Sequence, residues 1–339
     1  MNNSLGISVV ICAYNSAQRI EKTLEYLSEQ QVNDLFDWEV VLVDNGSTDS
    51  TAKIAIEHWH SLSMNNSLKV VNEFKQGLSF ARQTGVENSN FEYILFCDDD
   101  NYLASDYLRN AYMILEANPT VAALGGKGNV SSEIGIPYWF EHYKYCYACY
   151  SQGNDEIPLD TSPQSLFGAG LVFRKSVYSK LIRSGFKHIL SDRKGSSLIS
   201  GGDTELTFGF RLSGYLLAYS NTLQFSHFMT ANRLKESYLL KLIVSQAYSS
   251  SKLTVYSFLL NSKRPGLTHW IKDLVYQFYN LTKAWYAYYL KKEMTLLDRQ
   301  AAIQFAYGKF KGILTEWGSY QHKYDTLIKV YTKHGADNN

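Results

Sequence analysis

The sequence predicts an α/β protein, with a mostly parallel, Rossmann-like sheet flanked by helices and a mainly α-helical C-terminal region. Three observations support this prediction. Apolar runs with strand character alternate with helical patterns through the first half of the chain. Polar clusters follow three of these runs, where ligands bind in parallel sheets. After Ala231 apolar residues recur at helical spacing and the alternation stops.

The apolar runs of the first half are short and rich in β-branched residues, which favours buried strands over helices. The expected strands are residues 7–12, 40–43, 68–71, 93–97 and 121–124, with further short strands at 167–173, 215–219 and 223–228. Helices are expected at 77–86, 105–116 and 203–213. Asn15 and Ser16 are expected to cap a helix that follows the first strand.

Charge divides the 339 residues into two parts near residue 230. Residues 1–230 contain 17 basic and 25 acidic side chains, whereas residues 231–339 contain 16 basic and 7 acidic ones. The second part also holds 19 of the 49 aromatic residues. We therefore expect two functional regions, of which the basic one faces an anionic partner.

The four cysteines and the N-terminus indicate the compartment. Cys12 and Cys97 fall in expected strands, while Cys146 and Cys149 form a lone C-x-x-C without histidines at ligand spacing. Ordinary packing in a reduced cytosol is the favoured interpretation, ahead of a zinc or redox site. We expect neither a signal peptide nor a transmembrane helix, which needs about 18 apolar residues.

The acidic run Asp98-Asp99-Asp100 directly follows an expected strand. Three adjacent carboxylates repel one another, and burying them without a counter-charge is costly. A divalent cation resolves this, and carboxylate oxygens suit Mg²⁺ or Mn²⁺ shared with substrate phosphates. A solvated acidic turn is the alternative. The run therefore favours a metal site.

Asp44 ends a neighbouring expected strand, within Val43-Asp44-Asn45-Gly46-Ser47-Thr48-Asp49. A carboxylate in this place can accept a hydrogen bond from a base or a ribose. It can equally serve as a turn or helix-capping residue. The residue alone does not decide between these roles.

Together with these two segments, Val9-Val10-Ile11-Cys12-Ala13-Tyr14-Asn15 and Gly77-Leu78-Ser79-Phe80-Ala81-Arg82-Gln83-Thr84-Gly85 resemble glycosyltransferase family 2. The resemblance covers about residues 5–230 and rests on four segments in a fixed order. It implies a GT-A fold and transfer of a sugar from a nucleotide-sugar donor, typically a UDP-sugar. Residues 1–230 would then be the catalytic domain, with residues 1–126 for the nucleotide sugar and residues 127–230 on the acceptor side.

The resemblance also implies roles for single residues. Ala13, Tyr14 and Asn15 would line the nucleoside site and Asp44 would bind the base. Arg82 would lie near the donor or the acidic run, and Asp98 and Asp99 would contact the nucleotide. The implied ligands of Mn²⁺ or Mg²⁺ are Asp98, Asp100 and His227, although a histidine that follows a strand is more often structural. Such a cation would offset the charge that develops on the leaving nucleoside diphosphate.

The stretch Gly201-Gly202-Asp203-Thr204-Glu205 matches the segment in which the family carries its catalytic base. Asp203 matches the family's aspartate, but Gly202 stands where a glutamate is usual. Glu205 is therefore a second candidate for the base. The alternative for Asp203 is an acidic residue that stabilises a helix N-terminus. One base opposite the leaving group implies direct displacement with inversion.

Phe167-Gly168-Ala169-Gly170 also resembles a family segment near the acceptor side. The small size of Gly168, Ala169 and Gly170 would let the backbone approach a sugar. The same glycines are typical of a bulged strand. Trp139 is a candidate for stacking on the acceptor, or a core residue.

The C-terminal region, residues 231–339, extends beyond the resemblance. Helices are expected around Leu239–Ala247, Trp270–Tyr288 and Leu296–Leu314. They either pack on the catalytic domain or on a second subunit, or lie on an anionic membrane. In the latter case Lys272, Lys283, Lys291 and Lys292 would lie near headgroups, and Trp270, Trp285 and Tyr289 at the interface. Scattered lysines without a recognition motif argue against nucleic acid.

These observations together predict a metal-dependent glycosyltransferase that acts on a saccharide or lipid-linked saccharide in cell-surface polysaccharide synthesis. The expected location is the cytosol or the cytosolic membrane face. One alternative is an inactive nucleotide-sugar-binding scaffold. A sugar nucleotidyltransferase is less favoured, because it would need a glycine-rich loop where the chain has Ala13-Tyr14-Asn15-Ser16.

Overall fold

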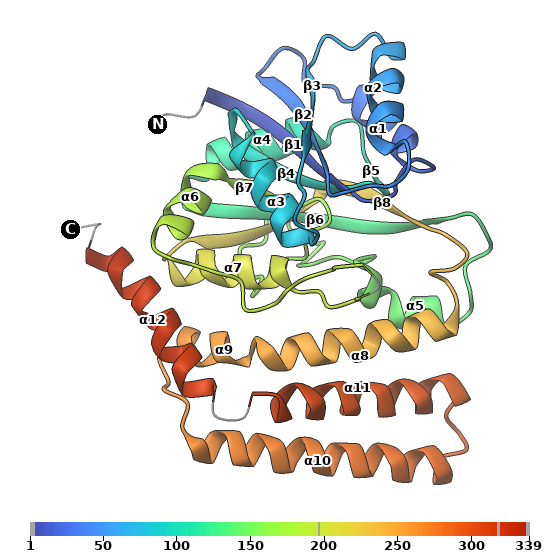
Figure 1. Cartoon of the computed structure of the whole chain (residues 1–339), viewed down its shortest axis with the longest axis vertical. Coiled ribbons are helices and arrows are strands. Elements are labelled where there is room, and N and C mark those ends of the chain that lie inside the picture. Colours follow the sequence, from blue (N-terminus) through green and yellow to red (C-terminus); the bar gives the residue numbers. More distant parts are fainter. Residues whose placement is uncertain (1–3, 196, 317–318, 337–339) are drawn as a thin grey trace.

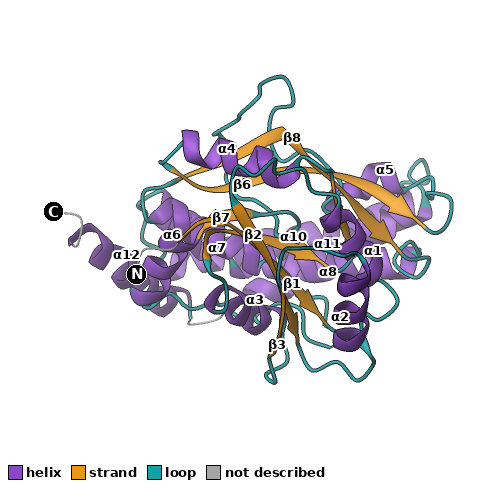
Figure 2. Ribbon diagram, turned by 90° about the horizontal axis from the view of Figure 1, so that it is seen from above, coloured by secondary structure: helices purple, strands orange, loops and turns teal. Residues whose placement is uncertain are grey.

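The computed structural model describes residues 4–195, 197–316 and 319–336. Within them, eight strands form one mixed sheet in the order β3-β2-β1-β4-β7-β6-β8-β5, with helices on both faces (Figures 1 and 2). The strands are β1 (Ser4–Ala13), β2 (Asp37–Asp44), β3 (Leu68–Asn72), β4 (Phe91–Asp98), β5 (Asn101–Leu103), β6 (Val121–Ser132), β7 (Val172–Arg174) and β8 (Leu216–Met229).

The N-terminal half of the sheet is parallel. β1 lies between β2 and β4, and β3 extends the sheet beyond β2. Ala13 pairs with Asp44, and Cys12 pairs with Asp98. The register therefore brings the carboxyl ends of β1, β2 and β4 to one rim, as the alternating pattern predicts.

The other half of the sheet holds two long strands, β6 and β8, that run parallel to each other, while β5 lies antiparallel to β8. Two short strands were expected here, but residues 216–229 form one continuous strand. The strand expected at 167–173 is reduced to β7, because the chain turns at Gly170, which has a φ of +69°.

Helices α1 (Ile20–Ser28), α2 (Thr51–Ser61) and α4 (Tyr107–Ala117) cover one face of the sheet. Helices α3 (Leu78–Glu87), α6 (Lys175–Arg183) and α7 (Gly202–Leu212) cover the other. The prediction that Asn15 or Ser16 caps the first helix is wrong, because α1 begins only at Ile20. The Ser16 hydroxyl instead donates to Asp99.

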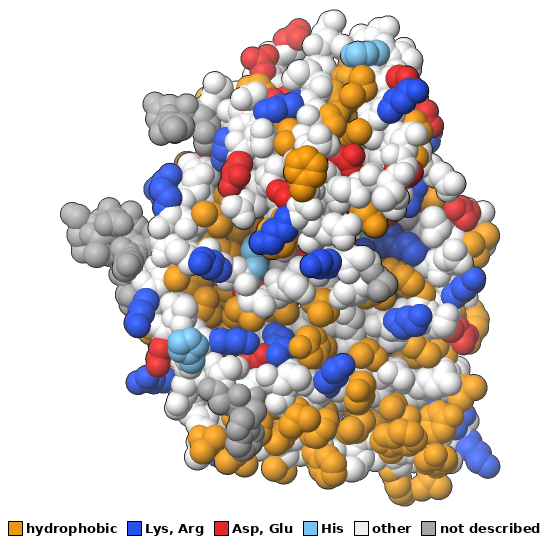
Figure 3. Space-filling model, in the orientation of Figure 1, with side chains coloured by type: hydrophobic (Ala, Val, Ile, Leu, Met, Phe, Trp, Pro, Cys, Tyr) orange, Lys and Arg blue, Asp and Glu red, His pale blue; other side chains and the backbone are white. Residues whose placement is uncertain are grey.

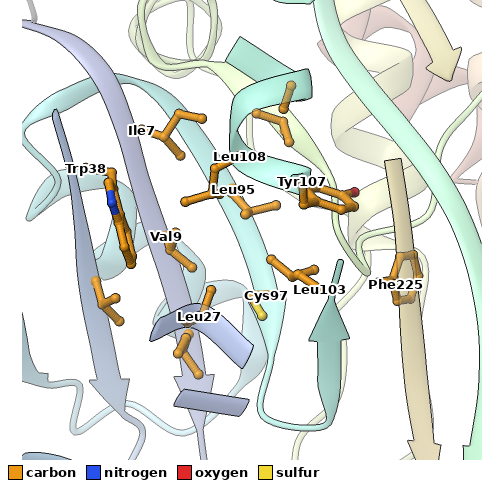
Figure 4. Close-up of a cluster of buried hydrophobic side chains, with 14 of the residues drawn as sticks. Ile7, Val9, Leu27, Trp38, Leu95, Cys97, Leu103, Tyr107, Leu108 and Phe225 are labelled. Carbon is orange, nitrogen blue, oxygen red and sulfur yellow. The ribbon is translucent and has the colours of Figure 1, made fainter. Parts of the chain in front are cut away.

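Two hydrophobic cores result, one on each face of the sheet. Figure 4 shows the first, where Ile7 and Val9 of β1 and Leu95 of β4 meet Leu27 of α1 and Leu108 of α4. The alternation of side chains along β1 places Val10 in the second core instead. Each such aliphatic side chain stabilises the fold by about 1.5–3 kcal/mol when fully buried.

The C-terminal helices are α8 (Glu236–Lys252), α9 (Thr254–Leu260), α10 (Leu267–Leu290), α11 (Leu296–Leu314) and α12 (Tyr320–Ala336). They form layers below the sheet: α8 packs on α11, and α11 packs on α10 (Figure 1). Two shorter elements, α5 (Phe140–Tyr143) and the 3-10 helix η1 (Lys144–Tyr147), lie against α8. Among the described residues, no helix combines the length and apolar character needed to cross a bilayer.

Candidate active site

A cavity of about 600 Å³ opens at the carboxyl rim of the parallel strands. Residues that follow β1 and β4 line it from the sheet, and Gly201, Asp203 and Thr204 line it from the start of α7. Gln246, Ser249 and Ser250 of the C-terminal half of α8 and Leu253, which follows it, also contribute. The cavity is therefore built by both parts of the chain.

The end of β1 supplies the first part of the lining. Ala13 is buried and Tyr14 is 44% exposed, and both face the cavity. Asn15 and Asp44 do not line it. The Asn15 side-chain oxygen accepts the N–H of Thr48, and an Asp44 carboxylate oxygen accepts the N–H of Ser47. Both side chains therefore hold the turn that follows β2.

The three aspartates at the end of β4 have different surroundings. Asp98 lines the cavity. Asp99 forms an ion pair with Arg19, with 2.7 Å between its Oδ2 and Nη2, and accepts the Ser16 hydroxyl. Burial and the nearby Asp100 raise the pKa of Asp99, against the effect of Arg19. Asp99 therefore has its own counter-charge within the fold.

Asp100 lies between His227 and Arg233. Its Oδ1 is 3.3 Å from Nε2 of His227, and its Oδ2 is 2.5 Å from Nη1 of Arg233. Burial alone would raise the pKa of Asp100, but the charges and hydrogen bonds of His227 and Arg233 hold it well below its usual range. Strand pairing fixes this arrangement, because Asn101, the next residue, pairs with His227 across β5 and β8.

The His227 ring is oriented as in a metal ligand. Its Nδ1 lies 2.7 Å from the carbonyl oxygen of Tyr147, and its Nε2 faces Oδ1 of Asp100. A divalent cation would take the place of the proton that Nε2 shares with this carboxylate. The described residues hold no group of three or more acidic, histidine or cysteine side chains arranged around one metal. A cation here would have two protein ligands, with the remaining oxygens from ligand and water.

Arg82 and Asp192 form a second charged group in the cavity. Nη1 of Arg82 lies 3.6 Å from Oδ2 of Asp192, and burial raises the pKa of Asp192 against the effect of Arg82. Asp192 lies directly over Gly202, because a Cβ on that glycine would be 2.7 Å from Oδ2 of Asp192. The position at which the family's glutamate is absent therefore has a carboxylate beside it.

Asp203 is held by backbone N–H groups at the start of α7. Oδ2 accepts from Gly168 at 2.5 Å, and Oδ1 accepts from Thr204 at 2.7 Å. A side chain at position 168 would collide with both partners, since its Cβ would be 2.5 Å from Nη2 of Arg82 and 3.1 Å from Oδ2 of Asp203. Gly168 therefore permits the close approach of Arg82 and Asp203.

Glu205 does not fit the role of a second candidate base. It is fully buried on the far side of α7 from the cavity, with its oxygens accepting the N–H groups of Ile189 and Leu190 and the hydroxyl of Tyr256. Nδ1 of His188 also lies 3.3 Å from Oε2, so four groups surround this carboxylate, and it does not line the cavity. Its role is to join α7 to α9.

Comparison with known proteins assigns the family. Residues 8–181 match the family described as "Glycosyl transferase family 2". The chain belongs to this family. It is similar to the cholesterol galactosyltransferase of Borreliella burgdorferi, with 33% identity over 107 residues, which are 31% of this chain and 28% of that protein. It also resembles the poly(ribitol-phosphate) beta-glucosyltransferase of Bacillus spizizenii, with 29% identity over 167 residues, 49% of this chain and 25% of the relative.

A third relative is the poly-beta-1,6-N-acetyl-D-glucosamine synthase of Staphylococcus epidermidis, which is 26% identical over 134 residues, 39% of this chain and 30% of that one. The chain thus matches less than a third of the length of each of these relatives. Among solved structures, GalNAc-T7 with UDP, GalNAc and Mn²⁺ has a TM-score of 0.51 at 14% identity, over 76% of this chain and 52% of that one. The GT-A fold class predicted from the sequence is confirmed.

Of the two alternatives for Trp139, acceptor stacking or a place in the core, the structure favours the core. Trp139 is buried against Phe140 and Tyr147 and does not line the cavity, because it fills the core between α5, η1 and α8. Gly168 and Ala169 do line the cavity. Gly170 lies behind them, where its carbonyl accepts the Tyr107 hydroxyl.

The cysteine pair also lies in this core. Cys146 and Cys149 are free and buried, and burial raises the pKa of each thiol to about 12. Buried thiols with raised pKa values are poor metal ligands and nucleophiles, as ordinary packing residues are.

Five charged residues that line the cavity escape prediction from the sequence: Arg19, Asp192, Arg193, Lys194 and Arg233. Asp192 falls in a basic, Ser/Gly-rich segment that resembles a surface loop, and Arg19 lies four residues beyond the β1 motif. Arg233 follows His227 by six residues without a recognisable spacing. The only sign of the basic residues in the sequence is the acidic run at the rim, because buried carboxylates need cationic partners.

Proposed function

We propose that this chain transfers a sugar from a nucleotide-sugar donor, with UDP-sugars favoured, to a hydroxyl of a saccharide or lipid-linked saccharide, with inversion and in the presence of Mn²⁺ or Mg²⁺. The observation that carries the proposal is that Asp98, Asp100, His227 and Asp203 all line one cavity. The names of two relatives, a poly-N-acetylglucosamine synthase and a poly(ribitol-phosphate) glucosyltransferase, support a role in polysaccharide synthesis, which we propose serves the cell surface.

The donor's diphosphate would lie near the acidic rim. Asp100 and His227 would hold the divalent cation, together with phosphate oxygens and water. When bound, the cation offsets the negative charge that develops on the leaving nucleoside diphosphate. Arg19, Arg82, Arg193, Lys194 and Arg233 also line the cavity, so its basic side chains suit the same anionic group.

Asp203 is the residue proposed to accept the proton of the attacking hydroxyl. Two backbone N–H groups orient its carboxylate in the cavity, which a general base requires. Attack assisted by one base, opposite the leaving group, is a direct displacement and inverts the anomeric carbon. The acceptor would reach Asp203 across Gly168 and Ala169, which leave the backbone accessible.

The cytosol is the proposed location, since the four cysteines are free and three of them are buried. The chain's partners under this proposal are the donor and the acceptor. Nucleic acid is not among them.

Calorimetric titration with UDP, GDP and dTDP, each with and without Mn²⁺, tests the proposal. We expect UDP to bind the wild-type chain in the presence of Mn²⁺, and Asp100→Asn to weaken this binding at least tenfold, because the variant removes a metal ligand that is also a charge. Asp34→Asn is the matched control, since Asp34 is exposed and remote from the site. If no nucleotide binds under any condition, the inactive-scaffold alternative replaces the proposal.

A further inference from the structure

The face of α10 that points away from the protein is apolar. Six side chains define this outer face: Leu267, Ile271, Val275, Tyr279, Tyr286 and Tyr289. Each is between 44% and 65% exposed. Residues at this spacing share one side of a helix, so they form a continuous stripe along its length. Figure 3 shows hydrophobic side chains gathered along this edge of the molecule.

The opposite face of α10 is already used for packing. Trp270 is buried and its indole N–H donates to the carbonyl of Ile313 at 3.1 Å, and Ala284 is also buried. A helix at the surface of a protein ordinarily presents polar residues outward. Because α10 is apolar on both sides, its outer face is unusual for a surface that only meets water.

The charges beside this stripe have one dominant sign. From residue 267 to residue 293 the exposed charged side chains are Lys272, Lys283, Lys291, Lys292 and Glu293. Asp273, the remaining charge, is half-buried near His269 and Lys309, and burial raises its pKa. The apolar stripe is therefore bordered by cations, and it ends at a pair of lysines.

We infer that the outer face of α10 binds to the surface of an anionic lipid bilayer, with the helix axis parallel to the membrane. Its apolar and tyrosine side chains would enter the headgroup boundary, and its lysines would meet anionic headgroups. The 24 residues of α10 span about 36 Å, so the whole length can lie in the interface.

Charge favours the bilayer over a second copy of the chain. In a symmetric dimer formed through this face, the same surface meets itself. Lys272 and Lys283 would then meet a face that offers no exposed acid between residues 267 and 290. An anionic bilayer supplies the missing negative charge without such repulsion.

Co-sedimentation of the full chain with vesicles tests the inference. We expect binding to vesicles of phosphatidylcholine with phosphatidylglycerol, weaker binding to phosphatidylcholine alone, and release by high salt. Lys272→Gln with Lys283→Gln should weaken binding to anionic vesicles roughly tenfold or more. Val275→Ser, Tyr279→Ser and Tyr286→Ser together should abolish it.

The matched control is Phe74→Ser with Tyr138→Ser, two apolar side chains that are 87% and 76% exposed elsewhere on the surface. This control should bind vesicles like the wild type. Equal loss in control and test variants, or no binding by the wild type, would overturn the inference. A dimer in light scattering that the α10 triple variant dissociates, without vesicle binding, would assign the face to a second copy. UDP binding reports on the catalytic proposal separately, since none of these residues lines the cavity.

Discussion

The carboxylate of Asp192 lies next to Gly202, the position at which the family usually carries a glutamate. It lies where the side chain of residue 202 would begin and forms an ion pair with Arg82. Arg82 in turn lies beside Gly168, where a Cβ would be 2.5 Å from its Nη2, and the N–H of Gly168 donates to Asp203. We therefore infer that Asp192, which also lines the cavity, positions the proposed base through Arg82 and Gly168.

This chain of contacts predicts the behaviour of Asp192→Ala. We expect the variant to bind UDP and Mn²⁺ almost normally but to lower kcat about tenfold to a hundredfold, because the base shifts relative to the acceptor. Adding Gly202→Glu should restore much of the rate. Gly202 has a backbone conformation that other residues adopt, and the removed Asp192 carboxylate vacates the required space.

Steady-state release of UDP from the donor that binds best, with KM and kcat determined separately, measures the effect. The rescue distinguishes positioning from folding, because a merely destabilised variant would not recover when a second residue is changed. Gly202→Glu in the wild-type background is the control and should reduce activity, since its Cβ would collide with Asp192. A double variant no more active than Asp192→Ala would contradict the prediction.

At the level of single residues, a place next to a strand end predicts some cavity-lining side chains but not all, since Asn15 and Asp44 hold the turn after β2 instead. Ala13, Tyr14, Asp98 and Asp100 face the cavity because strand pairing brings their positions to one rim. Asp203 and Glu205 are two residues apart on α7 and therefore point to different sides of the helix. Which side faces the cavity depends on the packing of α7, and the sequence does not show that packing.

At the scale of elements, the contact of α8 with α11 depends on two glycines. A Cβ on Gly308 would be 2.5 Å from the carbonyl oxygen of Val244, and one on Gly312 would be 2.6 Å from Cβ of Ser251. The two helix backbones therefore approach closely along this line. Apolar spacing in the sequence predicts both helices but not which of their faces meet. The same spacing occurs in the exposed stripe of α10, so it does not separate a packed face from an exposed one.

We expect Gly308→Ala to destabilise the protein by about 1–3 kcal/mol, because backbone atoms of α8 must move. The higher helix propensity of alanine offsets only about 0.5–1 kcal/mol of this. Chemical denaturation measures the difference in free energy of unfolding. Gly135→Ala is the control, since nothing lies within 4 Å of a Cβ there. Equal stability of the two variants would show that α8 and α11 can separate without cost.

At the scale of the whole molecule, the boundary predicted near residue 230 follows the change in charge, yet packing crosses it. The second core joins Leu206 and Phe210 of α7 to Tyr256 of α9 and Leu327 of α12. Glu205 also accepts the Tyr256 hydroxyl, and α8 lines the cavity. Composition changes near residue 230, whereas burial depends on contacts that a single sequence does not display.

A chain that ends at residue 230 should therefore fail to fold into a nucleotide-binding unit. Removing α8–α12 exposes many side chains of the second core and of the core around Trp139. Each fully buried side chain contributes about 1.5–3 kcal/mol, whereas the total stability of an ordinary domain is about 5–15 kcal/mol. It also leaves Glu205 without one of its buried donors. Circular dichroism melting and UDP titration of residues 1–230, beside the full chain, measure this. A cooperative melt with retained UDP binding would instead establish residues 1–230 as an independent catalytic domain. The helices α8–α12 would then be dispensable for folding and nucleotide binding, and their role would be limited to the outer face of α10.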